Sequence, residues 1–192
     1  MKKTILFLMI LGCFISNAVN AEMISVKVKW NTISCQRSCY ETLLPKLQAI
    51  PGVANVQFNA AFGEAKLEWR PNVPFSLDSV VTPLKLYGGG GVLAMEVEVR
   101  GTIYHSGDQV YLISSGDNVR YFLLGQVQYQ KNRWVMERSI YNHPLDPQMK
   151  LRLIEAEQNH EIVTIHGTLY GIETHQLNLI VLDVKYPDKE KK

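Results

Sequence analysis

The spacing of apolar residues constrains the fold of this chain most, because it switches between two periods in a definite order. Alternating apolar and polar residues are typical of a strand with one buried face, and apolar residues three or four positions apart are typical of a helix. Up to about residue 96 the order is β-α-β-β-α-β, which predicts a ferredoxin-like domain. The expected elements are strands at 24–30, 53–58, 64–69 and from about Val92, and helices at 39–50 and 76–84.

Strands dominate the rest of the chain. A long alternating run covers residues 95–104, and shorter runs follow between turns rich in glycine, asparagine and aspartate. One helix, expected at 146–158, precedes two closing strands. Three strands, a helix and two strands is the order of a small OB-type barrel. We therefore predict an α+β fold, with an N-terminal ferredoxin-like βαββαβ domain followed by a small OB-type β-barrel with one helix.

The first 21 residues have the character of a targeting segment. Two lysines precede an apolar run at residues 4–15, and Val19 and Ala21 are the small residues expected before a cut. We interpret the segment as a cleaved secretory signal, so the mature protein is expected to be periplasmic or secreted. The apolar run is too short to span a bilayer, and no transmembrane segment is expected elsewhere. Gly12 and Cys13 loosely match a lipoprotein box, so a lipid anchor at Cys13 is an alternative.

The charge balance argues against nucleic acid as a partner. Removing the two lysines of the signal leaves 18 basic and 18 acidic residues. A mature chain without net charge lacks the basic surface that nucleic-acid binding requires. No nucleic-acid partner is therefore expected.

Cys35 and Cys39 are the two cysteines of the expected mature chain, and they are the candidate site. Ser38 and Glu41 match a capping box, which would place Cys39 at the start of the first helix and Cys35 in the preceding loop. A helix N-terminus favours the thiolate, and the nearby positive charge of Arg37 acts in the same direction. Two soft sulfur ligands suit Cu(I) or Hg(II).

Residues 24–96 resemble the heavy-metal-associated domain of copper chaperones, metal-pumping ATPases and periplasmic mercury-binding proteins. The resemblance rests on the apolar spacing after Cys39 and on the Pro51-Gly52-Val53 sequence that follows it. The family loop usually reads Met-Thr-Cys-x-x-Cys, whereas this chain has Cys-x3-Cys and lacks the methionine. In that family a residue in the loop after the second helix approaches the metal, which implies a supporting role for Lys85 or Tyr87.

The resemblance completes the expected domain plan. The barrel segment looks like the OB-fold modules of bacterial periplasmic proteins, on element order and pattern. The predicted units are a signal peptide at 1–21, a heavy-metal-associated-like domain at 22–93, an OB-fold-like domain at 94–186 and a charged tail at 187–192.

Two other interpretations of the cysteines stay open. An exported protein meets oxidants, so Cys35 and Cys39 could form a disulfide instead of a metal site. Thiol redox chemistry is a third reading, although its usual Cys-x-x-Cys spacing is absent. His160, His166 and His175 could form a second metal site, but strand histidines are more often surface or hydrogen-bonded residues.

No catalytic motif is present in the sequence, and we do not expect an enzyme. On the barrel, Tyr111, Tyr121 and Phe122 could stack against a ligand, although aromatic residues in strands are mostly core. The sequence thus predicts an exported protein that binds a soft metal ion through Cys35 and Cys39, with Cu(I) favoured over Hg(II). The protein would sequester the ion or hand it on, and the barrel would dock a protein partner. The alternative is a non-catalytic binding or scaffold module with a disulfide-bonded cysteine pair and a barrel that recognises a protein or glycan.

Overall fold

The computed structural model describes residues 23–31, 37–87, 92–114, 119–126, 143–170 and 177–187. The predicted signal segment, the loose match to a lipoprotein box at Cys13 and all but the first residue of the predicted tail lie outside this description. The described strands are β1 (Met23–Trp30), β2 (Val53–Asn59), β3 (Glu64–Trp69), β4 (Val92–Ser106), β5 (Gln109–Ile113), β6 (Arg120–Leu124), β7 (Ile162–Tyr170) and β8 (Leu177–Lys185). The α-helices are α1 (Arg37–Gln48), α2 (Leu77–Tyr87) and α3 (Pro147–Gln158), with a short 3-10 helix η1 (Ala60–Phe62) after β2.

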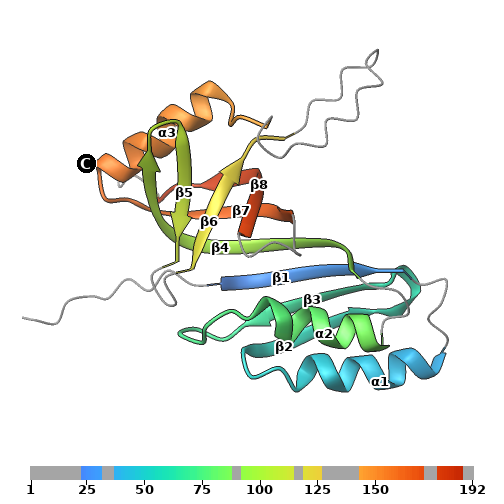
Figure 1. Cartoon of the computed structure of the whole chain (residues 1–192). Helices are drawn as coiled ribbons and strands as arrows, with labels where there is room; N and C mark the ends of the chain where they lie inside the picture. Colours follow the sequence, from blue (N-terminus) through green and yellow to red (C-terminus); the bar gives the residue numbers. More distant parts are fainter. Residues whose placement is uncertain are drawn as a thin grey trace, which may run out of the picture.

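The eight described strands form one continuous sheet. Their order is β2-β3-β1-β4-β5-β6-β8-β7, and a further pairing between β4 and β7 closes the last five strands into a barrel. The pairings are antiparallel except for β6 with β8, which run parallel. One end of the sheet is therefore closed and the other end stops at β2. Figure 1 shows β4 running between the barrel and the strands that α1 and α2 cover.

Strand β4 belongs to both parts of the sheet. One edge of β4 pairs with β1 along its first half and with β5 along its second half, while the opposite edge pairs with β7. Val97 consequently lies between Val26 of β1 and Gly167 of β7. A glycine is required where β4 turns into the barrel: a Cβ on Gly101 would lie 2.5 Å from the backbone oxygen of Ile113.

A single hydrophobic core runs through the molecule. The inward side chains of β1, β3 and β4 contact α1 and α2, and the same face of β4 continues into the barrel interior. Leu43 and Leu47 of α1 are fully buried there, as are Tyr121 of β6 and Leu153 of α3. The opposite face of the sheet carries the charged residues, because successive strand residues point to opposite faces.

The predicted fold class is wrong. About half of the described residues lie in strands, five strands close into a barrel, three lie outside it, and the described part has three α-helices. The barrel is consistent with an OB-like fold, but a separate ferredoxin-like domain is not shown. The physical reason is β4: one 15-residue strand serves both as the last N-terminal strand and as the first barrel strand. The expected boundary between residues 93 and 94 falls inside it.

Candidate functional site

The predicted cysteine site lies mostly outside the described structure. All of Cys35 and the side chains of Arg37 and Cys39 belong to the part that is not described. The backbone of α1 is described from Arg37, which makes Cys39 the third residue of the helix. This position is in the first turn, where the unpaired backbone N–H groups of a helix favour a negative charge.

Lys85 and Tyr87, which were expected in the loop after the second helix, lie instead within α2. Lys85 is an exposed residue in the last turn, and Tyr87 is the half-buried final residue. The ammonium of Lys46 lies 5.9 Å from the centre of the Tyr87 ring. Lys46 follows Cys39 by seven residues, which is about 10 Å along a helix. The described contact therefore joins Tyr87 to the last turn of α1.

The histidines do not gather into a second metal site in the described part of the chain. His160 lies in the turn after α3 with a positive φ of 53°, so it is not on the strand that carries His166. His175 is outside the described residues. Among the residues described, no three or more His, Cys, Asp or Glu side chains form a group able to hold a metal ion.

Three aromatic rings and one arginine form a cluster on the outer surface of the barrel. The aromatic–arginine cluster consists of Tyr104 of β4, Tyr111 of β5, and Phe122 and Arg120 of β6. Tyr104 pairs with Tyr111, and Tyr111 pairs with Phe122, across neighbouring strands. The ring centres are 6.3 Å and 5.4 Å apart in these two pairs. Three adjacent strands thus place the rings in one row.

Arg120 packs on this row of rings. Its guanidinium carbon lies 5.6 Å from the centre of the Tyr104 ring and 5.3 Å from that of Tyr111. A cation over aromatic faces at this distance is attracted by the ring quadrupoles, by about 0.5–1 kcal/mol at an exposed site. No described acidic side chain forms an ion pair with Arg120. The rings therefore hold an exposed guanidinium whose donors have no carboxylate partner in the described structure.

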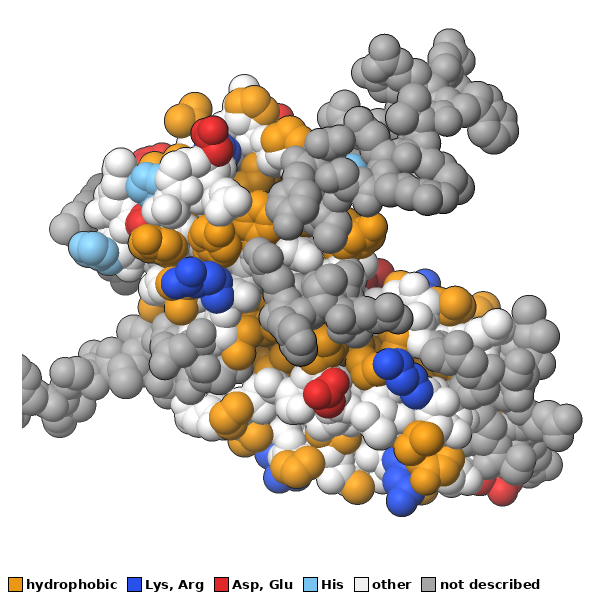
Figure 2. Space-filling model, viewed as in Figure 1, with side chains coloured by type: hydrophobic (Ala, Val, Ile, Leu, Met, Phe, Trp, Pro, Cys, Tyr) orange, Lys and Arg blue, Asp and Glu red, His pale blue; other side chains and the backbone are white. Residues whose placement is uncertain are grey.

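The alternation of strand side chains explains which aromatics are accessible. Tyr121 points into the barrel and is 0% exposed, whereas its neighbour Phe122 lies in the row of rings on the other side of β6 and is covered there, at 9% exposed. Tyr111 is half-buried in that row, and Tyr104 is 41% exposed. Of the three aromatics singled out from the sequence, Tyr121 is thus a core residue. Sequence reasoning missed Tyr104 and Arg120. Only the pairing of β4 with β5 and of β5 with β6 brings these two residues to the same row of rings. Figure 2 shows hydrophobic side chains and a basic group together on the barrel.

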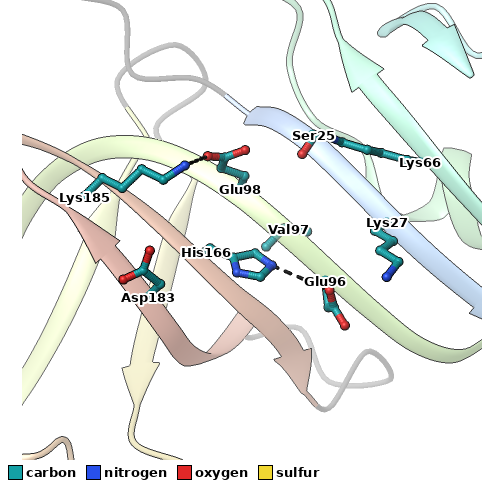
Figure 3. A pocket seen from close by; sticks show the side chains of 9 residues that line it. All are labelled: Ser25, Lys27, Lys66, Glu96, Val97, Glu98, His166, Asp183 and Lys185. Atoms are coloured by element: carbon teal, nitrogen blue, oxygen red, sulfur yellow. Dashed lines mark hydrogen bonds and ion pairs between the residues drawn. The ribbon is translucent and has the colours of Figure 1, made fainter. Parts of the chain in front are cut away.

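A second feature is a charged hollow of about 250 Å³ on the polar face of the sheet, where the outer strands meet the barrel. Figure 3 shows Lys27 and Lys66 on one side and the side chains of β7 and β8 on the other. Two contacts join oppositely charged or ionisable groups across it. The Lys185 ammonium lies 2.8 Å from Glu98, and the His166 ring lies 3.6 Å from Glu96. The hollow is lined by Ser25, Lys27, Lys66, Glu96, Val97, Glu98, His166, Asp183 and Lys185.

The ion pairs on this face shift the ionisation of their members. The hydrogen bond from Lys185 to Glu98 raises the pKa of that lysine above its ordinary value of 10.5. Next to the hollow, the Lys29 ammonium lies 2.7 Å from Glu64. This hydrogen bond lowers the pKa of Glu64 and raises that of Lys29. All three groups are solvent-accessible, so these pairs neutralise the surface and contribute little to stability.

We compared the chain with models of protein families, with curated proteins and with solved structures, and none of the three comparisons finds a match. The resemblance to heavy-metal-associated domains therefore stays a prediction from the residues. Within the described residues, no helix combines the length and apolar character needed to cross a membrane.

Proposed function

We propose that this chain is an exported, non-catalytic binding protein that docks an acidic segment of a protein partner on the aromatic–arginine cluster. The observation that carries the proposal is the exposed guanidinium of Arg120, packed on two tyrosine rings and without an acidic partner among the described residues. Tyrosine and arginine are the residues most enriched at the energetic centres of protein interfaces. The cluster has that composition on a rigid three-stranded surface.

The geometry of Arg120 supports a carboxylate as the ligand group. A guanidinium presents its donors in a planar fork that matches the two oxygens of a carboxylate. Packing on Tyr104 and Tyr111 restricts the side chain before binding, so less rotamer entropy is lost on complex formation. The partly exposed ring of Tyr104 offers an apolar surface beside the charge. An acidic residue next to an apolar one is the sequence that this surface fits.

A random peptide library tests the proposal. Panned against the mature chain, the library is expected to yield peptides with an acidic residue beside an apolar one. Arg120→Gln should weaken their binding at least tenfold, because the charge-assisted bidentate contact is lost. Arg120→Lys should bind at an intermediate level, since it keeps the charge without the planar fork.

Arg152 provides a matched control. Its guanidinium lies 4.3 Å from the centre of the Tyr186 ring, away from the cluster, so Arg152→Gln removes another stacked arginine. This variant should bind the selected peptides as the wild type does. Equal binding by the Arg120→Gln protein would contradict the proposal. If no peptide is selected and the chain binds acidic glycans on an array, the partner is a glycan and not a protein.

A second candidate function is the binding of a soft metal ion through Cys35 and Cys39. The observation in its favour is the start of α1 at Arg37, which puts Cys39 in the first turn and Cys35 two residues before the helix. Thiolates are stabilised at such a position, and two of them are sufficient for Cu(I) or Hg(II). The protein would sequester the ion or pass it on, while the barrel docks the partner. The supporting role of Lys85 or Tyr87 at this site rests on the resemblance to heavy-metal-associated domains alone.

Titration with Cu(I) against a competing chelator tests this second function. The reduced protein is expected to bind one ion per chain, and the Cys35→Ser, Cys39→Ser double variant none. Equal uptake by both proteins would exclude the site. Thiol labelling of protein taken directly from the export compartment tests whether Cys35 and Cys39 form a disulfide. Free thiols there would contradict the disulfide interpretation.

Export itself is also a proposal. It rests on the targeting character of the first 21 residues. N-terminal sequencing of the protein after expression in a bacterial host should give a chain that begins at Glu22. A chain that still starts at Met1 and stays inside the cell would contradict export.

A further inference from the structure

Strand β2 leaves one edge of the sheet open. It pairs with β3 alone, whereas each of the other seven described strands pairs with at least two neighbours. Along such an edge, alternate residues present backbone N–H and C=O groups without a strand partner. The other end of the sheet is closed by the barrel. Among the described strands, β2 is therefore the one whose whole outer edge has no strand partner.

From Asn55 to Asn59, β2 lacks the features that usually protect such an edge. Natural edge strands carry lysine or other charges, proline, or bulges that prevent pairing with another chain. The seven residues Val53–Asn59 contain neither a charged residue nor a proline. Their register with β3 is irregular only between Val53 and Asn55, and it is regular from there to Asn59. Five consecutive residues of β2 are thus free to accept another strand.

We infer that β2 pairs with β2 of a second copy of this chain, antiparallel and about a twofold axis at Gln57. Gln57 is the middle residue of the regular stretch, so only this centre pairs all five residues. Val56 then lies opposite Phe58 of the second copy, and the reverse. Both side chains are half-buried on the apolar face, and an aromatic residue beside a β-branched one is a favourable cross-strand pair.

A second copy fits this edge for two further reasons. The residues on the polar face would be Asn55 opposite Asn59 and Gln57 opposite Gln57, so no like charges meet. Pairing also uses up the free edge of both copies, which leaves a sheet closed by a barrel at each end. The assembly therefore stops at two chains, as expected for a twofold interface between identical surfaces.

Substitutions of Gln57 test the inference at the axis. Gln57 is exposed, lies opposite Lys66 of β3, and donates a hydrogen bond to Glu68. Lysine or glutamate at this position can each pair with one of these two neighbours, so both variants should fold. In the dimer, however, each would place two like charges directly opposite one another. Gln57→Lys and Gln57→Glu should each raise the dimer dissociation constant at least about fivefold.

Sedimentation velocity of the mature chain measures the effect. Cys35→Ser, Cys39→Ser is the background for all proteins, which removes dimers linked by a disulfide. At a protein concentration about three times the parent's dissociation constant, the parent is expected to be mostly dimer and each Gln57 variant mostly monomer. An equimolar mixture of the lysine and glutamate variants should be mostly dimer again. Thr168→Lys, on the same sheet face but far from β2 and opposite Glu96, is the matched control and should dimerise like the parent.

The same experiment can overturn the inference. A parent protein that stays monomeric at its highest soluble concentration has no self-association through β2. Dimers of unchanged affinity in the Gln57→Lys variant would place the interface elsewhere. Mixed variants that fail to dimerise would exclude the twofold axis at Gln57. Circular dichroism of each variant confirms that the comparison is between folded proteins.

Discussion

Replacing Val97 with alanine tests whether β4 joins the outer strands and the barrel into one folding unit. Val97 is 1% exposed and lies between β1 and β7 in the middle of β4. The change removes two buried methyl groups, each worth about 0.8 kcal/mol in transfer from water, and leaves a cavity beside them. We expect the free energy of unfolding to fall by about 2 kcal/mol. Arg100→Ala, on the exposed face of the same strand, is the control and should change it by less than about 0.5 kcal/mol.

Hydrogen exchange followed by mass spectrometry shows where this loss is felt. If the sheet unfolds as one unit, the slowest amides of β3 and of β7 exchange through the same global opening. A loss of about 2 kcal/mol should then speed both sets by the same factor of about thirty. Faster exchange in β7 with unchanged exchange in β3, or the reverse, would refute the reasoning. The two parts of the sheet would then unfold separately.

Three further predictions concern the barrel, a helix cap and a surface ion pair. Gly167→Ala should destabilise the fold by about 1–3 kcal/mol in urea denaturation, because its Cβ would lie 2.5 Å from a backbone oxygen of β8; a neutral effect would contradict that packing. Asp146→Ala should cost about 1 kcal/mol in thermal melting, because the Asp146 carboxylate accepts hydrogen bonds from two N–H groups of α3; Asp146→Asn should cost less. Lys29→Gln should raise the pKa of Glu64 toward its ordinary value of 4.5, which NMR titration measures. Because Glu64 has a lowered pKa in the folded state, the stabilisation from this pair is present above pH 4.5 and is lost as the pH falls through the lowered value. An unchanged Glu64 titration would show that the pair does not form.

Local patterns predicted most elements of the structure. The strand expected at residues 64–69 is β3 residue for residue, and the helix expected at 146–158 is α3 preceded by its cap, Asp146. Ser76 accepts a hydrogen bond at the start of α2, as its position before the apolar stripe indicates. These features depend on neighbours within a few residues, which the sequence displays directly.

Pairings between distant segments could not be read in the same way. The alternation in β4 shows that it is a strand, but not that three other strands share its two edges. Closure of the barrel depends on the parallel pairing of β6 with β8 and on that of β4 with β7, which join residues far apart in the chain. The aromatic–arginine cluster depends on the same long-range register, so neither Tyr104 nor Arg120 stood out in the sequence. The cysteine site stays a prediction, because its side chains lie outside the described residues.

The affinity of a selected acidic peptide for the wild type and for the Arg120→Gln variant tests the proposed binding function most directly. Isothermal titration calorimetry measures both affinities with the same folded chain. Our account predicts that the wild type binds at least ten times more tightly than the variant, and that the Arg152→Gln control matches the wild type. Equal affinities of wild type and Arg120→Gln would contradict it.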